Sequence, residues 1–106
     1  MSNSVRASHI LLMYKGSMRS SASRSQDEAK ALIQKLHDDV HAGGDFAALA
    51  KQHSDCPSSA KGGDLGNFGR GQMVPAFEEA AFGMEVGSTS GIVETPFGYH
   101  LIQRTG

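Results

Sequence analysis

The chain has 106 residues, of which 39% are hydrophobic and 20% are charged, and its formal net charge is −1. This length allows one domain with a modest core, and the balanced charge gives no strong field that would attract nucleic acid or a membrane surface. One cysteine excludes an internal disulfide and fits a reducing compartment, and the longest apolar run, residues 10–14, is far too short to cross a bilayer.

Residues 1–4 are polar and lack the apolar core of a secretory signal, and the absence of tryptophan excludes a WW-type phosphopeptide module from this sequence. We expect residues 1–4 to be disordered and residues 5–106 to form a single domain. We also expect a cytoplasmic monomer, or a nuclear one if the source is eukaryotic, with no nucleic-acid or membrane partner.

Residues 5–13 (VRASHILLM) have the composition of a β-strand. Alternation places Val5, Ala7, His9 and Leu11 on one face, and it places Ile10 and Leu12 on the other. Because apolar residues occur on both faces, the pattern predicts a central strand with a histidine on one side.

A loop at residues 14–24 (YKGSMRSSASR) follows, rich in serine and free of acidic residues. Its three cations, Lys15, Arg19 and Arg24, are open to two interpretations. The loop is either a solvated connector or a clamp for an anion, since lysine supplies a point charge and arginine a bidentate fork for carboxylate or phosphate.

Two helices are predicted next. Ser25 and Glu28 form a capping box, and apolar residues then recur at helical spacing as far as Val40. The glycines at residues 43–44 end this helix, and Asp45 is placed to cap a second, shorter one.

The glycine-rich stretch at residues 62–82 (GGDLGNFGRGQMVPAFEEAAF) organises the rest of the chain. It predicts a short half-buried strand at residues 64–68 and a helix that begins near Pro75. Leu65, Met73 and Phe77 would then converge from a strand, a loop and a helix start, and they would form an apolar pocket without charge.

The last segment predicts a hairpin, with strands at residues 91–95 and 99–104 joined by a type I turn at residues 95–98. The full order is strand, long loop, helix, helix, strand, helix and hairpin. This order predicts an α+β fold whose sheet is at least partly antiparallel.

Two histidines within strands, His9 and His100, together with Cys56, suggest three chemistries. A cysteine hydrolase needs an oxyanion hole, but Cys56 is followed by proline, which has no N–H to offer. A zinc site on these three residues lacks the paired ligand spacing that makes such an assignment specific. The third chemistry is prolyl isomerisation.

An X–Pro bond rotates over a barrier of about 18–20 kcal/mol, because amide resonance holds it planar. A catalyst of this rotation needs no covalent step. It needs an apolar slot for the proline ring, which disfavours the charge-separated planar form, and hydrogen-bonding groups that favour the twisted form. Leu65, Met73 and Phe77 could supply the slot. The polar wall could come from His9, Cys56, Thr95 and His100.

Three motifs carry a family resemblance: RASHILL, SDCPSSAKGGDLGNFGRGQMVPAFEEAAF and TPFGYHLIQR. In this order and spacing, the chain resembles the parvulin-type peptidyl-prolyl cis–trans isomerases from about residue 5 to residue 105. The resemblance implies a four-stranded, mostly antiparallel sheet surrounded by about four helices. It also implies proline-containing polypeptides as substrates, with no cofactor and no metal.

The resemblance assigns site residues as well. It places the active-site histidines of the family at His9 and His100, its cysteine-or-aspartate position at Cys56 and a hydrogen-bonding threonine at Thr95. It places the proline pocket at Leu65, Met73 and Phe77, with Phe68 nearby. Because the family accepts aspartate at the position of Cys56, the resemblance implies an electrostatic or hydrogen-bonding role rather than a thiol nucleophile.

Cys56 and the cationic loop resemble the branch directed to phosphorylated Ser/Thr-Pro sites. That branch has a lysine where Met13 stands and then an arginine pair, near which only Arg19 falls, with Lys15 and Arg24 as substitutes. Phe97 occupies the position of a small hydroxyl residue, as in bacterial parvulins.

The sequence therefore leaves phosphorylated, acidic and apolar residues before proline as competing preferences. A further alternative is a non-catalytic module of the same fold that binds proline segments or acts as a chaperone.

Overall fold

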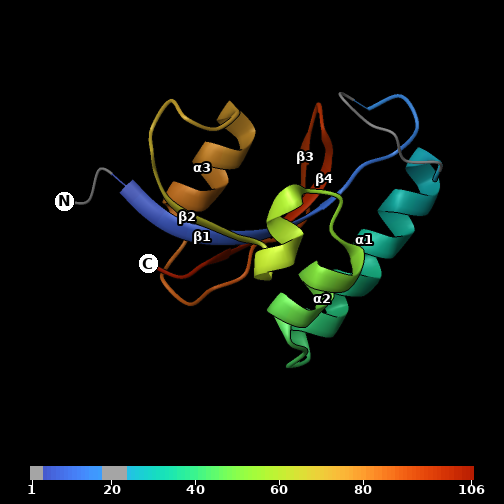
Figure 1. Cartoon of the computed structure of the whole chain (residues 1–106), viewed down its shortest axis with the longest axis horizontal. Coiled ribbons are helices and arrows are strands. Elements are labelled where there is room, and N and C mark those ends of the chain that lie inside the picture. The colour runs from blue at the N-terminus through green and yellow to red at the C-terminus, as the bar shows by residue number, and fades with distance from the viewer. Residues whose placement is uncertain (1–3, 18–23) are drawn as a thin grey trace.

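The computed structural model describes residues 4–17 and 24–106 (Figure 1). In chain order its elements are β1 (Ser4–Leu12), α1 (Gln26–His41), α2 (Phe46–His53), a 3₁₀ helix η1 (Pro57–Lys61), β2 (Asp64–Gly69), α3 (Pro75–Gly83), β3 (Val93–Thr95) and β4 (Gly98–Arg104). No helix in these ranges is both long and apolar enough to span a membrane.

The sheet has the strand order β2-β1-β4-β3, and each neighbouring pair is antiparallel. The predicted α+β class and four-stranded sheet are confirmed, and β1 is a central strand as expected. The helical part differs slightly from the expectation, because three elements are α-helices and the fourth, η1, is a short 3₁₀ turn.

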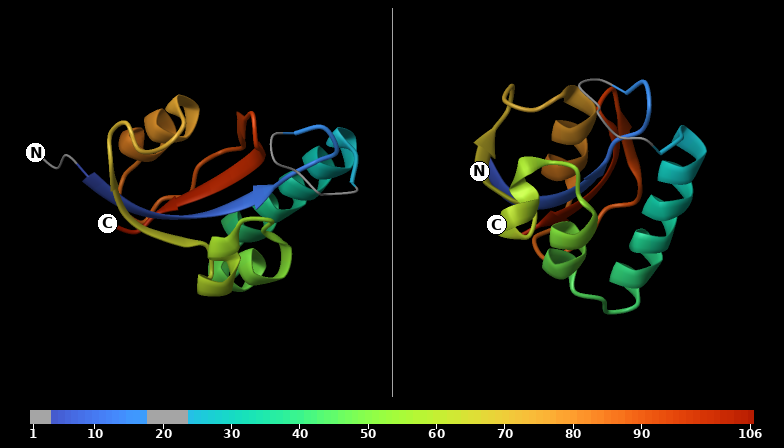
Figure 2. Two further views of the ribbon diagram at one scale, coloured as in Figure 1. Left: turned by 45° about the horizontal axis from the view of Figure 1, so that its top comes forward. Right: turned by 45° about the vertical axis from the view of Figure 1, so that its right-hand side comes forward.

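Helices lie on both faces of the sheet (Figure 2). The buried apolar side chains form two clusters. Helices α1 and α2 pack on one face, where the buried side chains include Ile10, Leu12 and Leu101. Helix α3 packs on the other face over Val5 and Ala7. This division follows the alternation of β1, so the predicted two-sided burial of that strand is confirmed.

Local sequence signals set the helix starts as expected. Ser25 accepts a hydrogen bond from Glu28 N while the Glu28 side chain accepts one from Ser25 N, which completes the capping box of α1. Asp45 likewise caps α2 by accepting from Ala48 N. Each cap satisfies a backbone donor that the helix itself leaves unpaired.

Strand β3 is shorter than predicted: it covers Val93–Thr95 rather than residues 91–95. Ser90 explains the difference. Its hydroxyl accepts a hydrogen bond from Ile102 N at 3.0 Å. In a regular antiparallel ladder, a backbone carbonyl would accept this bond instead. Beyond this point the pairing continues outside a named strand, through the bridge between Thr89 and Gln103 and the backbone bonds from Ser90 N to Ile102 O and from Arg104 N to Ser88 O.

Candidate active site

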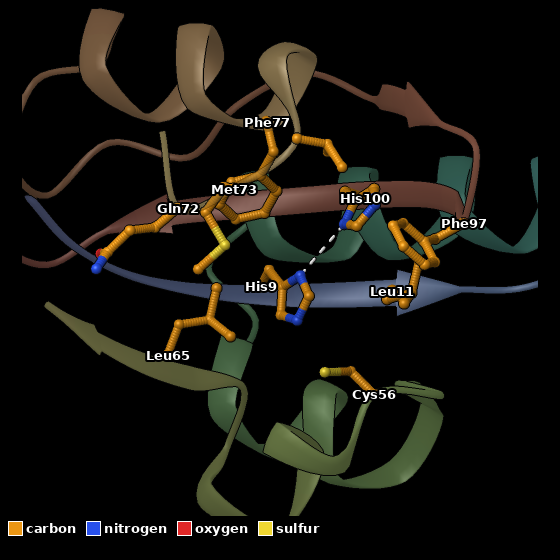
Figure 3. Close-up of a pocket in the computed structure, with 10 residues that line it drawn as sticks. His9, Leu11, Cys56, Leu65, Gln72, Met73, Phe77, Phe97 and His100 are labelled. Carbon is orange, nitrogen blue, oxygen red and sulfur yellow. Dashed lines mark hydrogen bonds between the residues drawn. The ribbon is translucent and has the colours of Figure 1, made fainter. Parts of the chain in front are cut away.

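A cavity of about 330 Å³ opens on the α3 face of the sheet (Figure 3). Its walls come from β1, β2, β4, the segment before η1, the loop that leads into α3, and the hairpin turn. The lining residues are His9, Leu11, Cys56, Leu65, Gln72, Met73, Val74, Phe77, Phe97 and His100. None of these side chains is a carboxylate, an amine or a guanidinium, so the cavity is largely apolar.

Six of the residues singled out from the sequence line this cavity: His9, Cys56, Leu65, Met73, Phe77 and His100. Thr95 and Phe68 are buried directly behind it. Thr95 Oγ1 lies 2.8 Å from His100 Nε2, and the Phe68 ring lies 5.8 Å from that of Phe77.

Four lining residues were not predicted as site residues: Leu11, Gln72, Val74 and Phe97. Leu11 could have been found, since it lies two residues from His9 on the same face of β1. Gln72 and Val74 flank Met73 in a loop without periodicity, and Phe97 lies at the turn of the hairpin. Their positions depend on tertiary packing rather than on a local pattern.

Glycine at position 63 allows β2 to approach the first histidine closely. Gly63 has φ +86°, and a Cβ there would lie 2.3 Å from the carbonyl oxygen of His9. In return, His9 N donates to Gly63 O at 2.9 Å. The backbone of His9 is therefore fixed from the side of β2, which is the strand that also carries Leu65.

The two histidines meet on the floor of the cavity. His9 Nδ1 and His100 Nδ1 are 3.2 Å apart, and the two rings stack with centroids 5.3 Å apart. The edge of the pair faces Phe77, whose ring centroid lies 5.5 Å from that of His9 and 5.4 Å from that of His100. Phe77 therefore holds both imidazoles against the base of the proposed slot.

Burial keeps both imidazoles neutral. Desolvation lowers the pKa of His9 from 6.5 to about 4. Desolvation, followed by repulsion from His9, lowers the pKa of His100 to about 3. At neutral pH each ring therefore carries one N–H, so one Nδ1 donates to the other.

The neighbouring threonine indicates which ring donates. Thr95 Oγ1 accepts a hydrogen bond from Phe97 N at 3.2 Å, which leaves its hydroxyl proton free to bond His100 Nε2. His100 then carries its proton on Nδ1 and donates to His9 Nδ1. The opposite arrangement would leave the threonine hydroxyl proton without an acceptor among the described residues.

This assignment places the proton of His9 on Nε2. That atom is buried and has no hydrogen-bond partner within the described part of the chain. In Figure 3 it lies on the side of the ring away from His100, toward Cys56. The chain of hydrogen bonds from Thr95 through His100 thus leaves one N–H donor unpaired and buried beside the cavity.

The apolar end of the cavity comes from three elements. Leu65 lies on β2, Met73 lies in the loop before α3, and Phe77 lies in the first turn of that helix. Pro75 begins α3, where the first helical position tolerates the missing N–H. Because the helix starts here, Phe77 points down into the sheet, and Figure 3 shows it with Met73 and Leu65 around one end of the cavity.

Cys56 is half-buried and immediately precedes η1. Within residues 4–17 and 24–106, its sulfur makes no hydrogen bond to either imidazole, and no group of three or more His, Cys, Asp or Glu side chains is arranged to hold a metal ion. The geometry therefore gives no support to a Cys–His hydrolase or to a zinc centre on His9, Cys56 and His100.

The cations of the loop at residues 14–24 differ in exposure and in their partners. Lys15 is exposed, and Arg19 lies outside the described residues. Arg24 is engaged: its guanidinium bonds the carboxylate of Asp55 and also donates to Met13 O at 3.1 Å. The loop has no acidic residue of its own, but the fold supplies one from the segment before Cys56.

Comparisons with known proteins agree with this geometry. Residues 1–106 match the PPIC-type PPIase domain. The chain is 48% identical over 112 residues to the peptidyl-prolyl cis-trans isomerase ESS1 of Saccharomyces cerevisiae, with 96% of this chain and 65% of that protein covered. It is 44% identical over 115 residues to the peptidyl-prolyl cis-trans isomerase Pin1 of Malus domestica, with 98% of this chain and 95% of that protein covered.

Solved structures give the same result. ESS1 from Candida albicans superposes with a TM-score of 0.95 at 41% identity, covering 98% of this chain and 63% of that chain. The solution structure of TbPIN1 superposes with a TM-score of 0.89 at 36% identity, covering 100% of both chains. The chain therefore spans less than two thirds of the two ESS1 proteins but nearly all of the Malus domestica Pin1 and of TbPIN1.

An α+β domain with an apolar cavity beside a buried histidine pair defines the class of prolyl isomerases described above. The chain belongs to the PPIC-type peptidyl-prolyl cis–trans isomerases, the parvulins.

Proposed function

We propose that the domain isomerises X–Pro bonds by a non-covalent mechanism, with the proline ring held between Leu65, Met73 and Phe77. The observation that carries the proposal is the position of this slot beside the neutral His9–His100 pair, with Phe77 in contact with both rings. The substrates are proline-containing polypeptides. A monomer is proposed as the working unit.

The physical basis is the charge of the amide. In the planar state, resonance places partial negative charge on oxygen and partial positive charge on nitrogen, and this separation is lost when the bond twists. An apolar slot therefore disfavours the planar state more than the twisted one. His9 Nε2 is an unpaired donor shielded beside this slot, so it compensates polar groups of the substrate only if the ring turns toward the cavity. Each reduction of the barrier by about 1.4 kcal/mol gives a tenfold faster rotation.

For the residue before proline, we propose a preference for uncharged, apolar side chains over phosphorylated or acidic ones. The lining residues carry no charge, and Leu11 and Phe97 extend the apolar wall beyond the histidines, at the end opposite Leu65 (Figure 3). Of the cations proposed as an anion clamp, Arg24 already has an internal carboxylate partner. Phosphorylated and acidic sites, served by Lys15 and Arg19, are the competing specificity.

A protease-coupled assay tests the activity and the preference together. Peptides with Leu, Ala, Glu or phosphoserine before proline would be compared at low and moderate salt. We expect acceleration over buffer for all four, with Leu-Pro and Ala-Pro at least as fast as the anionic pair. A phosphoserine peptide that is more than about tenfold faster, with a rate that falls as salt rises, would instead assign the loop to phosphate binding.

A non-catalytic binding module would give a different result. It would bind all four peptides without accelerating any of them. Peptide binding detected by NMR, combined with uncatalysed rates in the coupled assay, would replace the isomerase proposal with that alternative.

A further inference from the structure

Arg24 and Asp55 form an ion pair that joins the end of the cationic loop to the residue before Cys56. Their side chains are 27% and 28% exposed, so both are partly buried. The pair connects segments that lie far apart in the sequence, and it lies next to the cavity without lining it. It therefore needs an explanation other than direct contact with the proline slot.

The carboxylate of Asp55 has two partners. It accepts from Met13 N at 2.9 Å and from the guanidinium of Arg24. The same guanidinium donates to Met13 O. Both polar groups of the Met13 backbone are thus taken up by the ion pair, at the point where β1 has ended and the sheet can no longer bond them.

The contact continues toward the cavity along the backbone. Asp55 N donates to Leu11 O at 2.7 Å, and Leu11 N donates to Ser54 Oγ at 3.0 Å. The segment at residues 54–56 is therefore hydrogen-bonded along β1 from Leu11 to Met13. Leu11 on β1 and Cys56 on the facing segment both line the cavity.

An arginine that read a substrate anion would need a free guanidinium fork directed at the substrate. Here one nitrogen of that fork bonds both the Asp55 carboxylate and a backbone carbonyl, and the neighbouring carboxylate cancels its charge at short range. A phosphate would have to displace an internal partner that also supports the backbone of Met13. These contacts are typical of a side chain that fixes the position of the cavity wall.

We propose that Arg24 is a positioning residue of the isomerase site rather than an anion receptor. Together with Asp55, it holds residues 11–13 against residues 54–56 and so places Leu11 and Cys56 in the cavity wall. This inference rests on the proposed isomerase function, and it predicts that the contribution of Arg24 to catalysis is independent of the charge before proline.

The test compares Arg24→Gln, Asp55→Asn, the double variant and the rescue variant Arg24→Lys on phosphoserine-Pro, Glu-Pro and Ala-Pro peptides. Asp55→Asn keeps an oxygen for Met13 N while it removes the charge. Lys30→Gln, on the exposed face of α1, is the matched loss of one positive charge. Thermal melts confirm that each variant is folded.

We expect Arg24→Gln to lower kcat by about five- to tenfold on all three peptides, with KM little changed and the ratios between peptides preserved. The double variant should be no worse than either single variant, because each one breaks the same contact. Arg24→Lys should recover part of the activity on all three peptides, and Lys30→Gln should match the wild type.

A second readout follows the wall itself. The rate at which iodoacetamide alkylates Cys56 should change in Arg24→Gln and Asp55→Asn but not in Lys30→Gln. This measurement does not require turnover, so it tests the positioning role even if the wild-type protein accelerated none of the peptides. A loss of activity confined to the phosphoserine peptide, or variants that match the wild type in both readouts, would overturn the inference.

Discussion

His9 and His100 share a contact between their Nδ1 atoms at 3.2 Å, although 91 residues separate them in the chain. The register of β1 and β4 explains the contact. His9 pairs with Ile102 and Leu11 pairs with His100, so the two histidines are diagonal neighbours on one face of the antiparallel pair. The register of the two central strands therefore sets the geometry of the active-site floor.

Removal of the threonine hydroxyl should disturb this floor without changing its shape. In Thr95→Val, His100 Nε2 loses its partner in a buried position, at a cost of about 1–3 kcal/mol in the free energy of unfolding. We expect kcat/KM to fall about tenfold or more, because the order of proton positions along the two rings is no longer fixed. Denaturant unfolding and the coupled assay measure the two effects. Thr105→Val, at an exposed position, is the control, and equal activity of both variants would argue against the assigned chain of hydrogen bonds.

The two lowered histidine pKa values predict a pH dependence of stability. The unfolded chain takes up protons on these rings near pH 6.5, whereas the folded chain resists protonation until about pH 4 for His9 and about pH 3 for His100. The folded state therefore loses stability as the pH falls from 6.5 toward 4, with a slope on the order of 1 kcal/mol per pH unit for each ring. Above pH 6.5 this contribution is fully present and constant.

Activity should follow the same protonation states. With neutral rings throughout, kcat/KM on an uncharged peptide should be level between about pH 5 and pH 8, as long as the protein is folded. Initial rates in a constant-ionic-strength buffer series check this. A sigmoidal loss of activity centred near pH 6.5 would show that at least one of the rings titrates as an exposed histidine, contrary to its burial.

The proline slot can be tested with two methionines in comparable surroundings. Met73 lines the cavity, whereas Met84 packs against the same apolar cluster outside it, and both are half-buried. Met73→Ala should raise KM or lower kcat/KM by about tenfold, since it removes apolar surface from the substrate. Met84→Ala should cost similar stability but leave the kinetic constants within about twofold. Equal kinetic losses in both variants would mean that general loosening, not the slot, reduces activity.

Cys56 distinguishes a covalent mechanism from a non-covalent one. Its sulfur makes no bond to either imidazole in the described structure, and Cys56→Ala should retain measurable turnover, reduced by no more than about tenfold to a hundredfold. The substitution removes polar surface from the wall but leaves the slot and the histidine pair intact. Complete loss of activity in a variant that still binds substrate peptide would reinstate a thiol nucleophile.

Local patterns were sufficient for much of the fold. The alternation of β1, the capping box at Ser25 and Glu28, and the cap at Asp45 each act within a few residues, and each was predicted. Strand β3 was predicted too long, because the hydroxyl of Ser90 takes a backbone donor that belongs to a strand 12 residues away. That competition arises only once the hairpin has formed.

The site residues likewise include some that local sequence patterns predict and some that depend on tertiary packing. The spacing of Leu65, Met73 and Phe77 was enough to expect a pocket, and the two strand histidines indicated its floor. The pairing of Arg24 with Asp55 could not be expected, since 31 residues separate them and the loop itself is free of acids. For Gln72, Val74 and Phe97, the loop and turn conformations decide which side chains face the cavity, and these follow from the packing of α3 and the hairpin on the sheet.

The central claim is that an apolar slot beside a neutral histidine pair lowers the rotational barrier of an X–Pro bond. The most direct measurement is two-dimensional exchange NMR on a Leu-Pro peptide with a substoichiometric amount of protein. We predict cis–trans exchange peaks at mixing times well below the tens of seconds of the uncatalysed reaction, with exchange about tenfold slower in Met73→Ala but not in Met84→Ala. Peptide resonances that shift on binding while no exchange peaks appear would contradict the claim.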